Sequence, residues 1–133
     1  MSILVTGSAG HLGEGLLRTL RGDQVEATGL DIKASPYTDL VGSIADRDCV
    51  RKAMAGARTV FHAATLHKPH VATHSKSDFV ETNIQGTLVL LEEAVRAGVE
   101  SFIFTSTTSV FGDALRPPVT EPAAWVTEKV TPI

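Results

Sequence analysis

The chain has 133 residues, a formal net charge of −3 and a hydrophobic fraction of 43%. This length predicts one domain, and this hydrophobic content is enough to build its core. The mixed, slightly negative charge argues against a nucleic-acid-binding or anionic-membrane surface, and no apolar run approaches membrane-spanning length.

The cellular compartment is indicated by two features. Cys49 is the only cysteine and has no partner for a disulfide, which fits a reducing environment. The first residues lack the basic start and long apolar stretch of a signal peptide. We therefore expect a cytoplasmic protein.

Short apolar runs alternate with amphipathic segments along the chain. We predict strands at residues 2–6, 24–30, 39–41, 59–62 and 101–105, and helices at residues 11–21, 47–55 and 77–97. Asp46 can cap the second helix, which Gly56 closes. This alternation predicts an α/β protein, a Rossmann-type doubly wound parallel sheet with strand order 3-2-1-4-5, truncated before the sixth strand.

A glycine-rich turn follows the first predicted strand directly, at residues 6–13 (TGSAGHLG). Where a buried strand turns into a helix, unpaired backbone amides and the helix dipole favour a pyrophosphate. Gly7 permits the tight turn, Gly10 lets the phosphate approach the backbone, and Gly13 lets the helix lie close to the strand. The turn predicts a dinucleotide site.

Asp31 ends the second predicted strand, 18 residues after Gly13. A carboxylate there accepts hydrogen bonds from both adenosine ribose hydroxyls and repels a 2′-phosphate, so NAD is favoured over NADP. The alternative is a solvated aspartate that opens a turn before Pro36. Lys33 lies close enough to soften the NAD preference without reversing it.

The character of the chain changes after Gly112, where several prolines break any regular element. We therefore assign residues 1–112 to an NAD-binding Rossmann domain and residues 113–133 to an irregular, proline-rich tail.

The predicted helix at residues 77–97 has more apolar surface than one sheet face needs. Its two apolar sides consist of Phe79, Leu90, Ala94 and Ala97, and of Val80, Ile84, Leu88, Leu91 and Val95. A helix that is apolar over so wide an arc usually packs on two partners. A second helix or a second subunit, forming a homo-oligomer, explains the second side, and coverage by the tail is the alternative.

Further segments extend the pattern: residues 61–64 (FHAA), 83–87 (NIQGT) and 105–112 (TSTTSVFG). In this order and spacing, together with the glycine turn and Asp31, they resemble the extended short-chain dehydrogenase/reductase family, the NAD-dependent epimerase/dehydratases of nucleotide sugars. The resemblance runs through essentially the whole chain.

The resemblance implies a role for each matching position. It places the pyrophosphate on Gly7, Gly10, His11 and Leu12, the adenosine ribose on Asp31 and Ile32, and the adenine beside Ser43 and Ile44. It implies that the cofactor channel is lined by Ala63, Ala64, Thr65 and His67, with Thr105 near the nicotinamide. Asn83 would fix the backbone and solvent around the site. Thr107 falls at the catalytic Ser or Thr, which hydrogen-bonds the substrate oxygen.

Three positions depart from the family pattern. Ser43 stands where an aspartate often contacts the adenine, and Phe111 stands where a tyrosine is usual. The third departure concerns the general acid/base, a tyrosine followed four positions later by a lysine that lowers the phenol pKa. Tyr37 is the only tyrosine, and Val41 stands four positions later. The segment at 126–132 resembles the stretch just upstream of the catalytic tyrosine.

Other polar residues have plainer interpretations. His67, His70 and His74 have spacings that can share a helical face, but Pro69 interrupts the helix and no cysteine accompanies them, so we predict no metal site. We interpret His62 as a packed histidine rather than a base. Without the resemblance to the family, the run of hydroxyl residues at 105–109 could equally be a plain polar loop or part of a functional site.

The leading hypothesis is the NAD-binding portion of a nucleotide-sugar epimerase/dehydratase-type oxidoreductase that is inactive as this chain. In the complete enzyme, a sugar-nucleotide-like substrate would exchange a hydride with NAD. The alternative is a non-catalytic NAD(H)-sensing or interaction module that naturally ends at this length. A continuation of the reading frame with Tyr-x-x-x-Lys would favour the first hypothesis, and a stop codon the second.

Overall fold

A parallel sheet forms the centre of the computed structural model, which describes residues 2–107. Five strands lie in the order β3-β2-β1-β4-β5. Their bounds are β1 Ser2–Thr6, β2 Ala27–Asp31, β3 Leu40–Val41, β4 Ala57–His62 and β5 Ser101–Phe104. The predicted fold class and strand order are thus confirmed. The predicted domain boundary after residue 112 lies outside the described residues.

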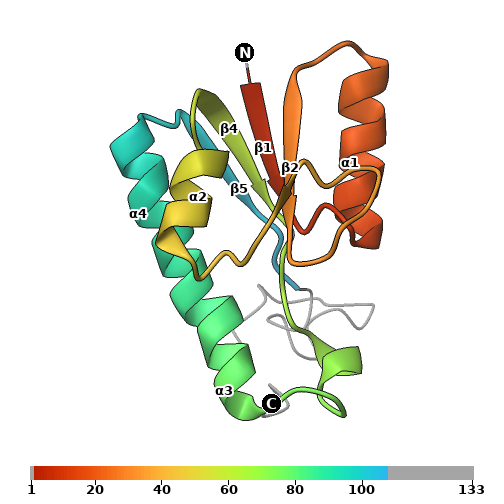
Figure 1. Cartoon of the computed structure of the whole chain (residues 1–133), viewed down its shortest axis with the longest axis vertical. Helices are drawn as coiled ribbons and strands as arrows, with labels where there is room; N and C mark the ends of the chain where they lie inside the picture. Colours follow the sequence, from red (N-terminus) through yellow and green to blue (C-terminus); the bar gives the residue numbers. More distant parts are fainter. Residues whose placement is uncertain (1, 108–133) are drawn as a thin grey trace, which may run out of the picture.

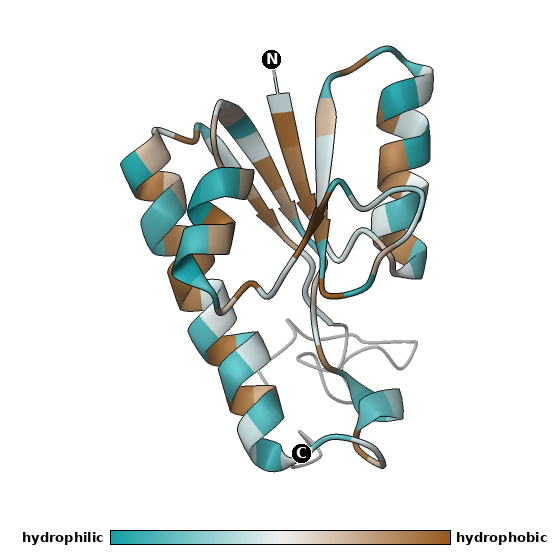
Figure 2. Ribbon diagram, viewed as in Figure 1, coloured by the Kyte–Doolittle hydropathy of each residue, from teal (hydrophilic) through white to brown (hydrophobic). Residues whose placement is uncertain are grey.

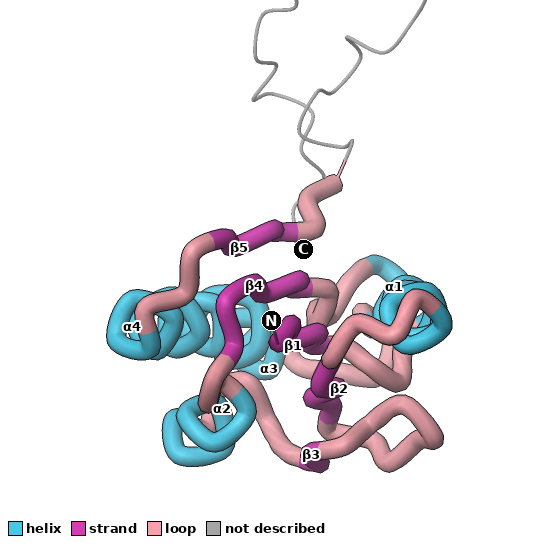
Figure 3. Tube along the Cα trace, turned by 90° about the horizontal axis from the view of Figure 1, so that it is seen from above, coloured by secondary structure: helices cyan, strands magenta, loops and turns pink. Residues whose placement is uncertain are grey.

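Helices cover both faces of this sheet. α1 (His11–Gly22) lies on one face, whereas α2 (Arg47–Ala53) and α4 (Thr87–Ala97) lie on the other (Figures 1 and 3). Right-handed crossovers produce this split, because the chain moves toward one edge of the sheet through α1 and toward the other through α2 and α4. Over residues 2–107, none of the helices combines the length and hydropathy needed to cross a membrane.

The predicted helix at 77–97 is a composite element. It begins as α3 (Lys76–Phe79) behind a capping box of Ser75 and Asp78, widens into the π-helical segment η2 (Val80–Gly86), and continues as α4 to Gly98 at φ 71°. Its first part extends past the carboxyl ends of the strands (Figure 1). The 3₁₀ segment η1 (Lys68–His70) lies beyond the same edge.

Several element boundaries differ from the prediction. β2 begins at Ala27 rather than at residue 24, because Gln24 adopts a φ of 60° and the Val25 amide bonds to the Leu20 carbonyl. These contacts belong to the end of α1, so they remove Val25 from the sheet. Asp46 caps α2 as predicted, accepting the amides of Asp48 and Cys49. This helix ends at Ala53 and β4 begins at Ala57, each two residues earlier than predicted.

The apolar core lies mainly between the sheet and the α2–α4 face. Figure 2 shows the brown, apolar stretch of the central strand and the mixed surface of the helices around it. The core comprises Leu4, Leu30, Ile44, Val50, Ala53, Met54, Ala57, Val60, Val89, Leu90 and Ala94. Each large buried side chain contributes about 1.5–3 kcal/mol, so the strands and their carboxyl ends are held firmly.

Candidate dinucleotide site

The glycine turn joins the end of β1 to the start of α1. Gly7 has a φ of 76°, and its amide bonds to the Leu30 carbonyl at 2.9 Å. Gly10 caps α1 without a side-chain hydrogen bond, so no capping side chain occupies the first-turn amides. Those amides and the helix dipole create the electropositive end that favours a phosphate. His11 and Leu12, both exposed, form this first turn.

Two of the three glycines are required by close packing. A Cβ on Gly7 would lie 2.7 Å from the Ala64 nitrogen, and one on Gly13 would lie 2.0 Å from the Gly7 carbonyl oxygen. Both contacts are to backbone atoms, which do not move aside as the end of a flexible side chain does. The predicted roles of Gly7 and Gly13 therefore have a direct geometric basis. A Cβ on Gly10 would meet only the Gly7 oxygen, at 3.2 Å.

The structure brings Asp31 to this turn. Its Oδ2 accepts the Ala9 amide at 3.0 Å, and its Oδ1 accepts the Lys33 amide at 2.9 Å. Each carboxylate oxygen has two lone pairs, so both retain capacity for a hydroxyl donor. The neighbouring Ile32 is 62% exposed. The pair of features that predicted a dinucleotide, the glycine turn and the acidic strand end, is thus joined by a hydrogen bond.

A chain of hydroxyls fixes the loop beyond Asp31, a feature that sequence reasoning missed. The fully buried Ser8 hydroxyl bonds to Thr38 at 2.8 Å, and Thr38 bonds to Ser35 at 2.9 Å. The Tyr37 ring in this loop packs under the Arg18 guanidinium, 5.0 Å from the ring centroid. Tyr37 therefore lies against α1. The sequence signal that could have indicated the Ser8–Thr38 hydrogen bond is the presence of a serine inside the glycine turn.

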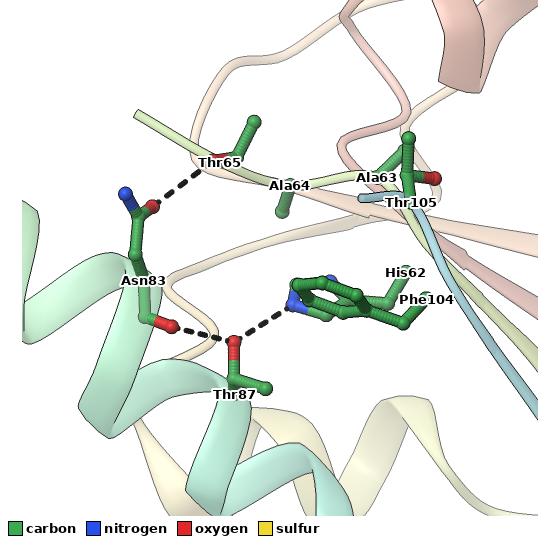
Figure 4. Close-up of a pocket in the computed structure, with 8 residues that line it drawn as sticks. All are labelled: His62, Ala63, Ala64, Thr65, Asn83, Thr87, Phe104 and Thr105. Atoms are coloured by element: carbon green, nitrogen blue, oxygen red, sulfur yellow. Dashed lines mark hydrogen bonds between the residues drawn. The ribbon is translucent and has the colours of Figure 1, made fainter. Parts of the chain in front are cut away.

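A small cavity of about 30 Å³ lies at the carboxyl ends of β4 and β5 (Figure 4). It is lined by His62, Ala63, Ala64, Thr65, Asn83, Thr87, Phe104 and Thr105. Five of these were predicted as cofactor-binding residues: Ala63, Ala64, Thr65, Asn83 and Thr105. Segments more than 40 residues apart in the chain meet here because parallel strands place their carboxyl ends at one edge of the sheet.

Asn83 holds the loop that follows β4. Its Oδ1 accepts the Leu66 amide at 2.8 Å, and its Nδ2 donates to the Leu66 carbonyl at 2.8 Å. The Thr65 hydroxyl also donates to Oδ1, at 3.1 Å. Asn83 thus satisfies both backbone groups of one residue, which agrees with the backbone-fixing role implied by the resemblance. It lies in the π-helical segment, and such segments often occur at functional sites.

His62 occupies the centre of the polar contacts around the cavity. Its side chain is 2% exposed and packs against the rings of Phe102 and Phe104, at centroid distances of 6.0 and 5.4 Å. Nδ1 lies 2.8 Å from the Thr6 hydroxyl and Nε2 3.0 Å from the Thr87 hydroxyl. Burial lowers the pKa of His62 to about 4, so the ring is neutral near pH 7. These contacts support the interpretation of a packed histidine.

The remaining predicted residues lie outside the cavity. His67 is exposed, and its amide donates to Nδ1 of His70 at 3.1 Å. Thr107 is exposed and follows the cavity residue Thr105 by two positions. The Ser43 hydroxyl accepts the Ala45 amide at 3.1 Å. Ile44 is only 5% exposed, so its side chain belongs to the core rather than to a ligand surface.

The three histidines after β4 pack edge to face. Ring centroids lie 4.7 Å apart for His67 and His70, and 5.4 Å apart for His70 and His74. In the part of the chain that the structure describes, no group of three histidine, cysteine or acidic residues is arranged to hold a metal ion.

Comparison with known proteins agrees with this geometry. Residues 3–130 match the family described as "NAD dependent epimerase/dehydratase family". The UDP-glucose 4-epimerase of Erwinia amylovora is 36% identical over 129 residues, which cover 84% of this chain and 38% of that protein. The dTDP-glucose 4,6-dehydratase of Streptomyces niveus is 35% identical, with coverage of 84% and 39%. The chain therefore spans about two fifths of the length of these curated relatives.

Solved structures show the same arrangement. A short-chain dehydrogenase/reductase superfamily protein from Agrobacterium tumefaciens, with bound NAD, superposes with a TM-score of 0.81 at 30% identity, covering 95% of this chain and 39% of that one. MoeE5 in complex with UDP-glucose and NAD superposes with a TM-score of 0.74 at 28% identity, covering 84% and 38%.

Proposed function

The chain belongs to the NAD dependent epimerase/dehydratase family, and we propose that it forms the NAD-binding portion of an oxidoreductase that acts on nucleotide sugars. One observation carries this proposal: Asp31 is hydrogen-bonded to the glycine turn at the uncapped start of α1. The pyrophosphate binds at the first-turn amides, beside His11, and the adenosine ribose hydroxyls bind Asp31.

The nicotinamide end of NAD extends toward the cavity at β4 and β5. The Gly7 turn touches the Ala63–Ala64 backbone, so a dinucleotide leaving the turn passes directly over this loop. Asn83 keeps the loop in place through Leu66, and Thr105 borders the far side. The supporting consideration is topological, because the ligand of a doubly wound sheet lies where the strand order reverses, here between β1 and β4.

In the complete enzyme, bound NAD would supply the hydride-transfer chemistry at a carbon of the sugar substrate. We propose that the Thr107 hydroxyl orients the reacting oxygen of the substrate. The proton requires a separate acid/base, and the only tyrosine, Tyr37, lies in the β2–β3 loop beside Arg18. We therefore expect no turnover from these 133 residues, since the Tyr-x-x-x-Lys pair is not among them. NAD-dependent oxidation of a sugar nucleotide by this chain would contradict that expectation.

Calorimetric titration with NAD, NADH and NADP tests the cofactor assignment. We expect NAD to bind more tightly than NADP, and Asp31→Ala to weaken NAD binding at least about a hundred-fold by removing two charge-assisted hydrogen bonds. Asp48→Ala is the matched control, because Asp48 is exposed and lies on α2. Tighter binding of NADP, or equal effects of the two substitutions, would contradict the assignment.

Two further proposals concern the protein's surroundings. We propose a cytoplasmic location, supported by the unpaired, half-buried Cys49, and fluorescence imaging of the tagged protein tests it. We also propose a homo-oligomer formed through the second apolar side of residues 77–97, which is exposed in the described structure.

A further inference from the structure

His62 lies within a series of hydrogen bonds that runs from Thr6 on β1 to Asn83 in the π-helical segment. Figure 4 shows the part of this series from His62 through Thr87 to Asn83. The Ala64 amide donates to the Thr6 hydroxyl at 3.3 Å, and that hydroxyl lies 2.8 Å from Nδ1 of His62. Nε2 lies 3.0 Å from the Thr87 hydroxyl, which in turn donates to the Asn83 carbonyl at 2.8 Å.

The direction of every bond in this series follows from its last member. A carbonyl can only accept, so the hydrogen of the Thr87 hydroxyl is committed to Asn83. Nε2 of His62 must then donate to Thr87. A neutral imidazole has one N–H, which leaves Nδ1 to accept from Thr6. The Thr6 oxygen in turn accepts the Ala64 amide, so each hydroxyl donates one bond and accepts one.

Both ends of the series touch backbone that the proposed cofactor needs. The Ala64 nitrogen lies only 2.7 Å from where a Cβ of Gly7 would be, so this amide adjoins the pyrophosphate turn. At the other end, Asn83 holds Leu66 in the loop beside the nicotinamide. The series therefore couples the two halves of the site through one buried ring.

We propose that His62, as the neutral Nε2–H tautomer, is a positioning residue that holds the pyrophosphate turn and the nicotinamide loop in register for NAD. The proposal rests on the proposed NAD-binding function. It assigns His62 no contact with the cofactor and no role in proton transfer. Phe102 and Phe104 pack against the ring on the β5 side, and a ring with nitrogens on opposite sides reaches Thr6 and Thr87 simultaneously.

Nitrogen-15 NMR of the histidine rings in the full chain tests the tautomer without cofactor. We expect His62 to show a protonated Nε2 and an unprotonated Nδ1 near pH 7. An Nδ1–H tautomer, or a doubly protonated ring, would overturn the proposal, because either one breaks the direction set by the Asn83 carbonyl.

Two substitutions of His62 test whether it couples the two halves of the site. The longer side chain in His62→Gln keeps a donor near the Thr87 hydroxyl but loses the hydrogen bond with Thr6. The shorter side chain in His62→Asn keeps the hydrogen bond with Thr6 but loses the one with Thr87. We expect His62→Gln to speed hydrogen exchange at the Ala64 amide and His62→Asn to speed it at Leu66, each about ten-fold, as one hydrogen bond is lost. Equal effects of both variants at both amides would indicate a purely packing role and overturn the proposal.

NAD affinity provides the functional readout. Thr87→Val removes the hydroxyl and is expected to weaken NAD binding about five-fold, the size of one typical hydrogen bond. Thr87→Ser restores the hydroxyl and should rescue binding. Thr19→Val is the matched control, because the Thr19 hydroxyl also donates to the carbonyl four residues earlier, on the exposed side of α1. An unchanged affinity in Thr87→Val would overturn the proposal.

The outcomes separate this inference from the proposed function. If the unaltered chain binds no NAD, the proposed function fails, and the tautomer and the two exchange patterns still decide whether the directed series exists. If NAD binds but the hydrogen bonds of His62 have another direction, only the inference about His62 fails.

Discussion

At the scale of single residues, the site depends on backbone contacts that exclude side chains. Gly13 and Gly15 lie two positions apart in the first half of α1, yet their surroundings are opposite. A Cβ on Gly13 would lie 2.0 Å from the Gly7 oxygen, whereas a Cβ on Gly15 would have nothing within 4 Å. The glycine spacing in the sequence indicated this difference, because only Gly13 belongs to the three-glycine pattern.

These two glycines give a matched pair of substitutions. We expect Gly13→Ala to lower the free energy of unfolding by about 1–3 kcal/mol and to abolish NAD binding, since the helix must move away from the turn. Gly15→Ala should raise it by about 0.5–1 kcal/mol, because alanine favours an exposed helix position. Urea unfolding and calorimetry measure both effects. A stable, NAD-binding Gly13→Ala variant would contradict the close-packing argument.

His62 also makes stability depend on pH. Its pKa is about 4 in the folded chain against an ordinary value of 6.5, so between these pH values only the unfolded chain binds a proton there. Acidification therefore lowers the free energy of unfolding, by up to about 3 kcal/mol from pH 6.5 to pH 4. Below pH 4 this contribution levels off.

Urea unfolding over this pH range, compared between the unaltered chain and His62→Gln, measures the contribution. We expect the variant to be less stable at pH 7 and its stability to depend less on pH. Parallel pH curves would show that the imidazole is not held neutral by burial.

At the scale of elements, α2 and α4 are joined by a buried carboxylate. Glu93 on α4 is 3% exposed and contacts Arg47 and Arg51 of α2, at 2.9 and 3.2 Å, and Arg96 one turn later at 3.5 Å. The hydrogen bonds from Arg51 and then Arg47 hold the pKa of Glu93 below its ordinary value. The sequence alone showed a charged position on a helix and did not reveal that this position would be buried beside the arginines of α2.

Glu93→Gln should destabilise the fold more than Glu92→Gln. Glu93 loses its charge against several guanidinium groups in a buried position, whereas Glu92 pairs with Arg47 at the surface. Because the Glu93 pKa is lowered on folding, its stabilisation is present above pH 4.5 and is lost as pH falls through the folded pKa. Thermal unfolding at pH 7 and pH 3 measures this. An equal effect of the two substitutions at pH 7 would contradict it.

The π-helical segment shows where prediction at this scale stops. Apolar spacing predicted one helix over residues 77–97, and the structure has a wider turn at Val80–Gly86. The apolar pattern of a helix is nearly the same in both geometries, so the sequence does not separate them. The wider turn is the part of the helix that carries Asn83 to Leu66.

At the scale of the whole molecule, one side of the composite helix faces solvent. Its exposed apolar stripe consists of Val80, Ile84, Leu88, Leu91 and Val95. The other apolar side is buried at Phe79, Leu90 and Ala94, whereas Ala97 is exposed. An apolar stripe of this length is a surface on which copies of the chain can associate.

Light scattering tests this association. We expect a mass above the 14.1 kDa of one chain, rising with concentration, and a return toward one chain in the double variant Leu88→Lys and Leu91→Lys. Gln85→Lys, at an exposed polar position of the same composite helix, is the control and should leave the mass unchanged. A monomer at high concentration would count against the homo-oligomer.

The sequence by itself determined the fold class, the strand order, the glycine turn and its acidic partner. Each of these depends on local periodicity or on short-range spacing, and both can be identified in the amino-acid sequence. The tertiary structure alone decided what meets at the strand ends: Ile44 in the core, Asn83 on Leu66, and His62 between Thr6 and Thr87. Hydrogen-bond direction and burial depend on neighbours that are remote in sequence, so no pattern within one segment contains them.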